Sequence, residues 1–234
     1  MMNWIRRPII GARAGMTFSI VARDPRTGAF GAAAATGTPA VGGLVLHLAS
    51  DVGAIATQGL STNPFYGVRG LRLLKAKFNA DETRRKLTEE DDGRDARQLI
   101  IVDRSGRTSG WTGLDNVEKK HIIVGQNVAL AANWVVSEDV IVAAKDAFEN
   151  SASPTFAAKL IDALAAGERA GGDLRGLRSA AVQVVCRSHP PIDLRADFDQ
   201  QPITRLAEIH RATLEPDFQS FLARVPTIAD PMRR

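Results

Sequence analysis

The sequence is poor in the residues that build disulfide frameworks and metal sites. Cys186 is the only cysteine among 234 residues, so an internal disulfide is impossible, which is typical of a protein kept in a reducing cytoplasm. A chain of this length buries a sizeable core without cross-links. The histidines lack the spacing of metal ligands, so we expect neither a metal site nor a serine–histidine–acid hydrolase. They are His47, His121, His189 and His210.

Formal charge is almost absent between Thr27 and Val68, where Asp51 is the only charged side chain. Glycine and proline interrupt this stretch, and it contains no run of the ~20 apolar residues that a membrane-spanning helix needs. We therefore expect no contact with a membrane. We interpret the stretch as strands that are covered on both faces, because such strands lose the alternation of polar and apolar residues.

The chain also lacks a basic stripe of the kind that binds nucleic acids. Its formal net charge is +4, and Arg6, Arg7 and Arg13 supply three of these charges in a segment without acids. Elsewhere basic residues are interleaved with acidic ones, as in "ADETRRKLTEEDD", so we expect no nucleic-acid partner. The glycine motifs that bind nucleotide phosphates are missing, and we expect no cofactor.

Residues 1–16 differ from the rest of the chain but do not resemble a signal peptide. Their apolar stretch is interrupted by Pro8 and Gly11 and stays shorter than the roughly 7 residues of a secretory core. Two explanations stay open. Either the true start is Met16 and the upstream codons are a mis-set start, or the segment is a functional arm. No linker composition interrupts residues 17–234, so we expect them to form a single domain.

Hydrophobic period and turn residues predict strands and helices in alternating blocks. The helix over 153–167 is expected to have Ser153 as its N-cap and Gly167 as its end, and the last helix is expected to break before Pro216. Strands are predicted at 17–24, 29–36, 44–50, 52–59, 97–103, 108–113, 121–125, 127–132, 178–186 and 193–198. Helices are predicted at 63–78, 80–89, 137–150, 153–167 and 202–225.

This order predicts an α+β fold in which two antiparallel sheets pack face to face between helices. Such a four-layer helix–sheet–sheet–helix sandwich covers its strands on both faces, which explains the missing charge. Thr17 is expected to begin a central strand. The helices at about 65–90 and 137–167 are expected to cover the outer faces.

Several stretches of the chain resemble a known bacterial family, the domain of unknown function 1028. They are "TFSIVARDPRTGAFGAA", "GAIATQ", "NPFYGVRGL", "RQLIIVD" and "AGGDLRGLRSAAVQVV", and the resemblance runs from about Thr17 to Leu206. Members of the family are similar to N-terminal nucleophile (Ntn) hydrolases, which implies the same four-layer sandwich. The chain departs from the family pattern at Gly110–Gly113, where a histidine is expected second, and in lacking a cysteine soon afterwards.

The resemblance implies that Thr17 is a catalytic nucleophile. In Ntn hydrolases the first residue attacks an amide carbonyl with its side chain, while its own α-amine accepts the proton. An α-amine has a pKa near ~7.7–8.0 and is well suited to act as a base at neutral pH. If translation begins at Met16, removal of that methionine exposes Thr17. The alternative is that Thr17 is an ordinary strand residue, since threonine is common in strands.

Other polar residues are candidates for binding a substrate. Thr36 and Thr38 flank a glycine-rich connection whose donors suit an oxyanion, and Asn133 follows an apolar strand. Arg175 suits a carboxylate and Asp173 an ammonium group. The alternatives are a plain hairpin connection at 36–43, a capping role for Asn133, and a structural ion pair between Asp173 and Arg175. Weaker candidates are Gln58, Asn63 and Tyr66.

Two functions are compatible with these features. The first is hydrolysis of a small amide or peptide-like compound by an Ntn-type mechanism. The second is binding of a small ligand, without catalysis, by a protein that keeps the sandwich. The state of Thr17 discriminates between them, because only a free N-terminal amine completes the catalytic pair. The sequence is compatible with a homo-oligomer but does not predict one.

Overall fold

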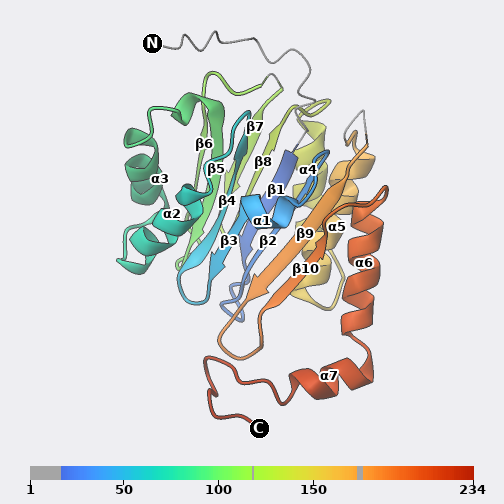
Figure 1. Ribbon diagram of the computed structural model, residues 1–234. Coiled ribbons are helices and arrows are strands. Elements are labelled where there is room, and N and C mark those ends of the chain that lie inside the picture. The colour runs from blue at the N-terminus through green and yellow to red at the C-terminus, as the bar shows by residue number, and fades with distance from the viewer. Residues whose placement is uncertain (1–16, 118, 173–175) are drawn as a thin grey trace, which may run out of the picture.

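The fold is described by a computed structural model over residues 17–117, 119–172 and 176–234. The segment 1–16, with its two explanations, lies outside the described residues. The described residues form two antiparallel sheets that pack face to face, as Figure 1 shows. One sheet has six strands in the order β10-β9-β2-β1-β8-β7, and the other has four in the order β3-β4-β5-β6.

The strands match the predicted ones to within a few residues. The six-stranded sheet contains β1 (Thr17–Arg23), β2 (Phe30–Thr36), β7 (His121–Gly125), β8 (Val128–Asn133), β9 (Ser179–Val185) and β10 (Ile192–Ala196). The four-stranded sheet contains β3 (Leu46–Ala49), β4 (Gly53–Gly59), β5 (Arg97–Asp103) and β6 (Thr108–Thr112). Every pair of neighbours is antiparallel, and Thr17 begins a central strand, as the sequence predicted.

Helices cover both outer faces, which completes the predicted α+β four-layer sandwich. Two helices pack on the four-stranded sheet, and three pack on the six-stranded sheet (Figure 1). The first two are α2 (Phe65–Lys75) and α3 (Ala80–Glu89), and the other three are α4 (Asp139–Asn150), α5 (Phe156–Arg169) and α6 (Pro202–Thr213). A short helix, α1 (Val41–Val45), precedes β3, and a 3-10 turn spans Arg94–Ala96.

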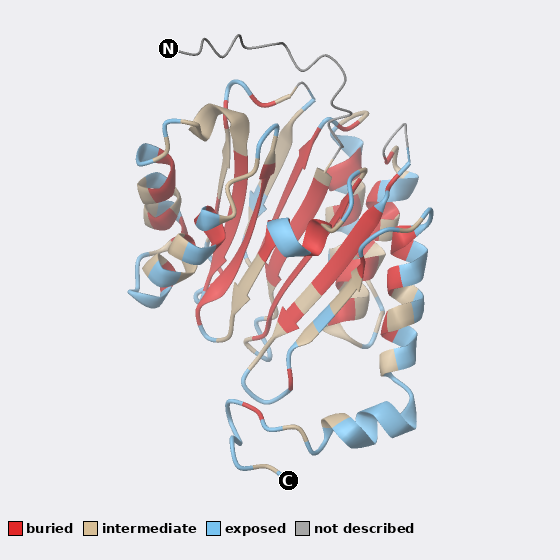
Figure 2. Cartoon of the chain, viewed as in Figure 1, coloured by how far each residue is buried: buried red, intermediate tan, exposed pale blue. Residues whose placement is uncertain are grey.

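The core consists of three apolar layers, because the central strands bury both of their faces. In β1, Phe18 and Ile20 pack against the helices, while Val21 packs between the two sheets. A third layer lies between the four-stranded sheet and α2 and α3, and it includes Ile55 and Leu99. Figure 2 shows the central strands as almost entirely buried. This double coverage explains why so little charge lies between Thr27 and Val68.

Two helix boundaries differ from the sequence prediction. The N-cap of α5 is Thr155, whose Oγ1 accepts a hydrogen bond from the Ala158 N–H at 3.1 Å, rather than Ser153. Gly167 does not end this helix but lies buried within it. A Cβ at Gly167 would lie 2.9 Å from the Phe18 ring, so the glycine allows α5 to approach β1 closely. Close packing, rather than helix termination, therefore accounts for this glycine.

The buried face of α2 is not the one that its large apolar residues indicate. Val68 is 44% exposed, and Phe78, the last residue of the predicted helix, lies beyond the end of α2. The buried face instead contains Tyr66, Gly67 and Leu74. A Cβ at Gly67 would lie 2.0 Å from Cγ of His47, so the helix packs closely at this glycine. Because glycine has no side chain, the apolar pattern of the sequence does not indicate this buried face.

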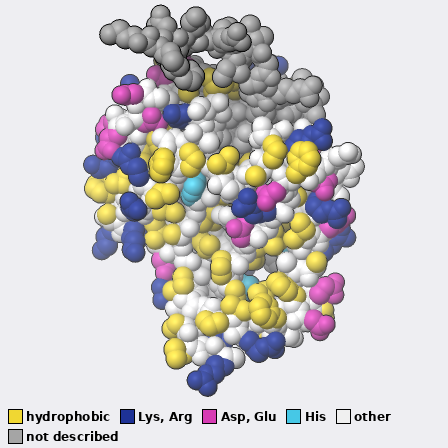
Figure 3. All heavy atoms as spheres, in the orientation of Figure 1, with side chains coloured by type: hydrophobic (Ala, Val, Ile, Leu, Met, Phe, Trp, Pro, Cys, Tyr) yellow, Lys and Arg dark blue, Asp and Glu magenta, His cyan; other side chains and the backbone are white. Residues whose placement is uncertain are grey.

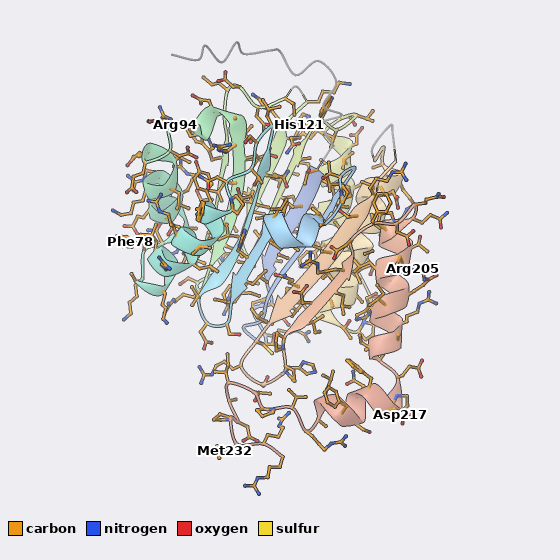
Figure 4. The ribbon with its side chains drawn as sticks, in the orientation of Figure 1. Phe78, Arg94, His121, Arg205, Asp217 and Met232 are labelled. Carbon is orange, nitrogen blue, oxygen red and sulfur yellow. The ribbon has the colours of Figure 1, made fainter. Side chains whose placement is uncertain are left out.

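The C-terminal part extends away from the sandwich. The predicted break before Pro216 is present, and α7 (Pro216–Leu222) buries none of its residues. Figure 4 shows Asp217 on this helix and Arg205 on α6, with Met232 near the end of the chain. On the face shown in Figure 3, basic and acidic side chains are interspersed. Among the described residues, none of the helices is long and apolar enough to cross a membrane.

Candidate active site

Four neighbouring strands of the larger sheet have a polar residue at the same edge, where β1 and β9 begin and β2 and β8 end, and each of these residues points between the sheets. Val21 of β1 lies in the apolar layer between the sheets, and the period of two places Thr17 on the same face. The same alternation brings Thr36, Asn133 and Ser179 inward on β2, β8 and β9. Thr36 pairs with Thr17 and Ser179, and Thr17 pairs with Asn133, so the four residues form one row.

A second polar row faces the first one from the smaller sheet. Gln58 of β4 pairs with Gln98 of β5, which pairs with Thr112 of β6. Hydrogen bonds join the two sheets here. Gln58 Nε2 donates to the backbone carbonyl of Thr17 at 3.0 Å, and Ser19 Oγ donates to Gln58 Oε1 at 2.7 Å. The two sheets are therefore held together at this edge by amides rather than by aliphatic side chains.

Gln98 is the centre of this polar network and is completely buried. Its Oε1 accepts hydrogen bonds from Gln58 Nε2 at 2.7 Å and from Asn133 Nδ2 at 3.2 Å. Its Nε2 donates to Thr112 Oγ1 at 2.9 Å and to the carbonyl of Ala132 at 3.0 Å. A satisfied buried network of this kind rigidifies its surroundings, because any displaced member would lose its partners away from water. The network forms a rigid floor beneath Thr17.

Thr17 lies above this floor, at the edge of a cleft of about 190 Å³. The residue is only half-buried, and its Oγ1 lies 2.9 Å from Thr36 Oγ1. Thr36 Oγ1 is in turn 3.5 Å from Thr38 Oγ1, so three hydroxyls follow one another into the cleft. The cleft is lined by Thr17, Thr36, Thr38, Pro39, Val41, Leu44, Val45, Gln58, Gly59, Leu60 and Thr62.

One wall of the cleft consists of the connection after β2 and the short helix α1. Ser179 holds both parts, because its Oγ donates to the Thr38 carbonyl at 2.6 Å and accepts from the Val41 N–H at 3.1 Å. Ala40 caps α1 in a left-handed conformation with φ of 60°. The sequence predicted a strand from residue 44, but Gly42 allows a turn of helix to pack close to Ala181, and Gly43 allows it to pack close to Arg195.

The other wall is the loop that follows β4. The Leu60 N–H donates to Asn116 Oδ1 at 2.9 Å, and Arg97 Nη1 donates to the Ser61 carbonyl at 2.6 Å. Asn63 Nδ2 donates to Asp91 Oδ2 at 3.0 Å. These contacts anchor the loop on both sides of Thr62. Both walls of the cleft are therefore fixed by hydrogen bonds before any ligand arrives.

Asp91 is the charged residue on which the second wall depends. Burial alone would raise the pKa of this carboxyl, but hydrogen bonds from Asn63, Gly93 and Arg97 outweigh it and lower the pKa to about 2. The Arg97 Nε lies 3.3 Å from Asp91 Oδ2, and both side chains are largely buried. Asp91 therefore stays ionised across the physiological pH range and holds the loop through charge-assisted hydrogen bonds.

This shift predicts a pH-dependent contribution of Asp91 to stability. We expect Asp91→Asn to lower the free energy of unfolding by about 1–3 kcal/mol at neutral pH, because charge-assisted bonds are lost. The folded pKa lies below the unfolded value of ~3.9, so the contribution is present above that value and disappears as the pH falls toward the folded pKa. Urea titrations should show that the difference from wild type shrinks as the pH falls from about 5 to about 2. A constant difference would contradict this account.

The predicted site residues occupy different positions around the cleft. Thr17, Thr36 and Thr38 line it, and so does Gln58, a weaker candidate. Asn133 lies in the polar network below the cleft, where it bonds to Gln98. Asp173 and Arg175 lie outside the described residues. Two other weak candidates are not among the described residues that line the cleft, since Asn63 anchors the loop and Tyr66 lies on the buried face of α2.

Several residues of the site were not found by sequence reasoning. Gln98, Ser19 and Ser179 were missed, as were Leu44 and Leu60 in the walls. A signal for the first three was present, because each continues the inward alternation of an apolar strand with a polar residue. No such signal existed for the two leucines, whose positions depend on α1 and on the loop.

No arrangement for binding a metal ion was found in the described parts of the chain. Over these residues, His, Cys, Asp and Glu side chains do not gather in groups of three or more that could hold an ion. His121 lies at the start of β7 (Figure 4), whereas His210 lies on α6 and bonds to Thr155. The polar side chains among the described residues that line the cleft carry hydroxyl and amide groups.

The fold and the cleft together define an α+β sandwich with a threonine-lined cleft at one edge. The chain belongs to the family of unknown function DUF1028, whose model matches residues 17–206. Protein SPO2555 from Silicibacter pomeroyi, of the same family, has a similar crystal structure, with 34% sequence identity and a TM-score of 0.88. The match covers 93% of this chain and 98% of that chain.

A more distant match is Anbu (ancestral beta-subunit) from Yersinia bercovieri, with 12% identity and a TM-score of 0.39. It covers 89% of this chain and 98% of that chain, but at this similarity it supports no argument about this protein. No curated protein matches the chain.

Proposed function

We propose that the protein hydrolyses a small amide or peptide-like compound, with Thr17 as the nucleophile. The position of Thr17 is the observation that carries the proposal. Its hydroxyl begins a central strand, reaches a cleft with fixed walls and lies 2.9 Å from a second hydroxyl, while Gln58 holds its backbone carbonyl. A nucleophile held in this way is oriented before the substrate binds. The resemblance to Ntn hydrolases supports the same residue.

The mechanism requires that Thr17 is the first residue of the mature chain. Thr17 Oγ1 attacks the amide carbonyl carbon, and the free α-amine accepts the hydroxyl proton. The amine then passes this proton to the leaving nitrogen as the amide bond breaks, which leaves an ester on Thr17. Water hydrolyses the ester, releases the acid and restores the hydroxyl. We propose that the mature protein works in the cytoplasm, where its single cysteine stays reduced.

The remaining candidates have supporting roles in this proposal. Thr36 orients the nucleophile, and Thr38 extends the hydroxyl row toward the substrate. Asn133 acts through Gln98, whose amide also contacts Gln58, and so keeps the floor beneath Thr17 in place. Asp173 and Arg175, which lie outside the described residues, are proposed to bind charged groups of the substrate.

The alternative is a protein that binds a small ligand without catalysis. When Thr17 is not the N-terminal residue, the composition of the cleft favours ligand binding without catalysis. None of the described residues that line the cleft titrates near neutral pH, since they are threonine, glutamine, glycine, proline and aliphatic residues. With an amide nitrogen at Thr17, whose lone pair is delocalised, the cleft has no base among these residues.

The two functions are separated by making two forms of the protein. One begins at Met16 and is trimmed to Thr17, and the other begins at Met1. After both N-termini are confirmed by mass, each form is assayed against a panel of small amides. We expect the Thr17 form to be at least about a hundredfold faster, the usual contribution of a general base. Equal rates, or no hydrolysis by either form, would favour ligand binding instead.

A further inference from the structure

The described side chains that line the cleft are mostly of two kinds. Thr17, Thr36, Thr38 and Thr62 carry hydroxyl groups. Pro39, Val41, Leu44, Val45 and Leu60 are apolar. None of the described lining residues is charged. An ionised group placed here would lose its hydration without gaining an ionic partner from these residues, which is strongly unfavourable.

The amide of Gln58 does not reduce the cost of placing an ionised group in the cleft. Its Nε2 already donates to the Thr17 carbonyl and to Gln98 Oε1, and its Oε1 accepts from Ser19. Its two donor hydrogens are therefore used within the protein. Arg195 packs against Gly43 of α1, but it pairs with Asp197 at 3.1 Å and is not among the described residues that line the cleft. Polar recognition at the described lining is thus left to hydroxyl groups.

Two leucines make the mouth of the cleft apolar. Leu44 on α1 is 49% exposed, and Leu60 in the opposite wall is 51% exposed. Hydrogen bonds to the backbone hold both leucines in place, because Ser179 accepts from the Val41 N–H of α1 and Asn116 accepts from the Leu60 N–H. Half-exposed leucines on both walls of one cleft offer apolar area that a ligand can bury.

The size of the cleft limits the group that it can hold. Its volume of about 190 Å³ is smaller than the 300–1,000 Å³ of sites for drug-sized ligands. At ~30 Å³ for each water-sized group, it has room for about six heavy atoms. The cleft therefore suits one short branch of a substrate rather than a whole peptide.

We propose that the cleft beside Thr17 binds the acyl side of the substrate, and that this acyl group is uncharged and aliphatic, with about four to six carbons. This inference rests on the proposed function, which places the scissile carbonyl at Thr17. The aliphatic chain packs between Leu44 and Leu60, and the threonine hydroxyls face the carbonyl end. A charged part of the substrate, if present, then belongs to the leaving amine outside the cleft.

The test compares p-nitroanilides that differ only in the charge of the acyl group. The 4-methylpentanoyl and succinyl compounds have the same number of heavy atoms and the same branched shape, but the succinyl group ends in a carboxylate. The Thr17 form is assayed with both. We expect kcat/KM to be at least roughly tenfold higher for the neutral compound, because the charged one must be desolvated. A preference for the succinyl compound would overturn the inference.

A charge introduced at the mouth should change this preference. Leu60→Lys supplies a partner for the carboxylate and is expected to reduce the preference for the neutral compound by about tenfold. Leu214→Lys is the matched control, since Leu214 is 45% exposed and does not line the cleft, and it should leave the preference unchanged. An equal effect of both substitutions would show that the net charge of the protein, not the cleft, sets the preference.

A binding experiment separates this inference from the proposed function. Thr17→Ala is mixed with 4-methylpentanamide or with the anion of succinamic acid, and binding is measured by saturation-transfer NMR. If no form hydrolyses any amide but the neutral amide binds selectively, the proposed function fails, while the preference of the cleft for an uncharged aliphatic group holds. If hydrolysis occurs but the anion binds better, the acyl inference fails and the proposed function holds. Absence of selective binding likewise contradicts the acyl inference.

Discussion

Replacing Thr17 with alanine is expected to abolish amide hydrolysis while the protein stays folded. The substitution removes the attacking oxygen, and losses of a nucleophile lower kcat by about a thousandfold or more. Its effect on stability should be small, because Thr17 is only half-buried and the substitution removes one side-chain hydrogen bond, that with Thr36. We expect a loss of roughly 0.5–1.5 kcal/mol in the free energy of unfolding. Rates on the Thr17 form and urea titrations measure the two quantities.

Two further variants test whether a loss of activity in Thr17→Ala is due to the loss of the nucleophile. Thr17→Ser keeps the hydroxyl and should retain measurable activity, although its side chain is less restricted than that of threonine. Thr204→Ala removes an exposed threonine on α6, away from the cleft, and should leave the rate unchanged. An active Thr17→Ala protein would exclude Thr17 as the nucleophile and would leave ligand binding as the better account of the cleft.

Replacing Gln98 with leucine is expected to cause the largest loss of stability at this edge. The substitution removes the acceptor of Gln58 Nε2 and Asn133 Nδ2, and the donor to the Ala132 carbonyl. Each buried group left without a partner costs about 1–3 kcal/mol. Because the groups act as one network, we expect a total loss of roughly 3–5 kcal/mol in the free energy of unfolding.

The matched control for this prediction is Gln200→Leu. Gln200 is exposed, so the same change of side chain should alter the free energy of unfolding by less than about 0.5 kcal/mol. Denaturant titrations of the three proteins provide the comparison. If Gln98→Leu is as stable as the control, then the polar network does not hold the two sheets together, and the rigid floor beneath Thr17 is not required by the fold.

Much of the fold was predictable, because local sequence patterns determine where its strands and turns lie. The alternation in "TFSIVAR" and the turn that follows it predicted β1 and β2, and the hairpin of β5 and β6 was predicted in the same way. The lack of charge between Thr27 and Val68 predicted strands covered on both faces, which the three apolar layers confirm. These features depend on neighbours in the sequence and on burial in general, not on particular distant contacts.

Helix ends and buried faces were predicted less well, because distant residues decide them. Gly167 resembles a helix end in the sequence, but it lies inside α5 since Phe18 of β1 packs against it. Gly67 has no side chain to count as apolar, yet it defines the buried face of α2 through its contact with His47. In both cases a small residue marks close packing that the sequence alone does not reveal.

The sequence by itself identified Thr17, Thr36 and Thr38 as candidates, but only the tertiary structure placed their side chains around one cleft. The reason is that strand register joins residues that are far apart in the chain. Thr36 lies opposite Thr17 in the sheet, and Gln58 reaches Thr17 from the other sheet, 41 positions along the sequence. A period of two predicts which face a residue occupies, whereas the strand order and the packing of the two sheets decide which residues meet there.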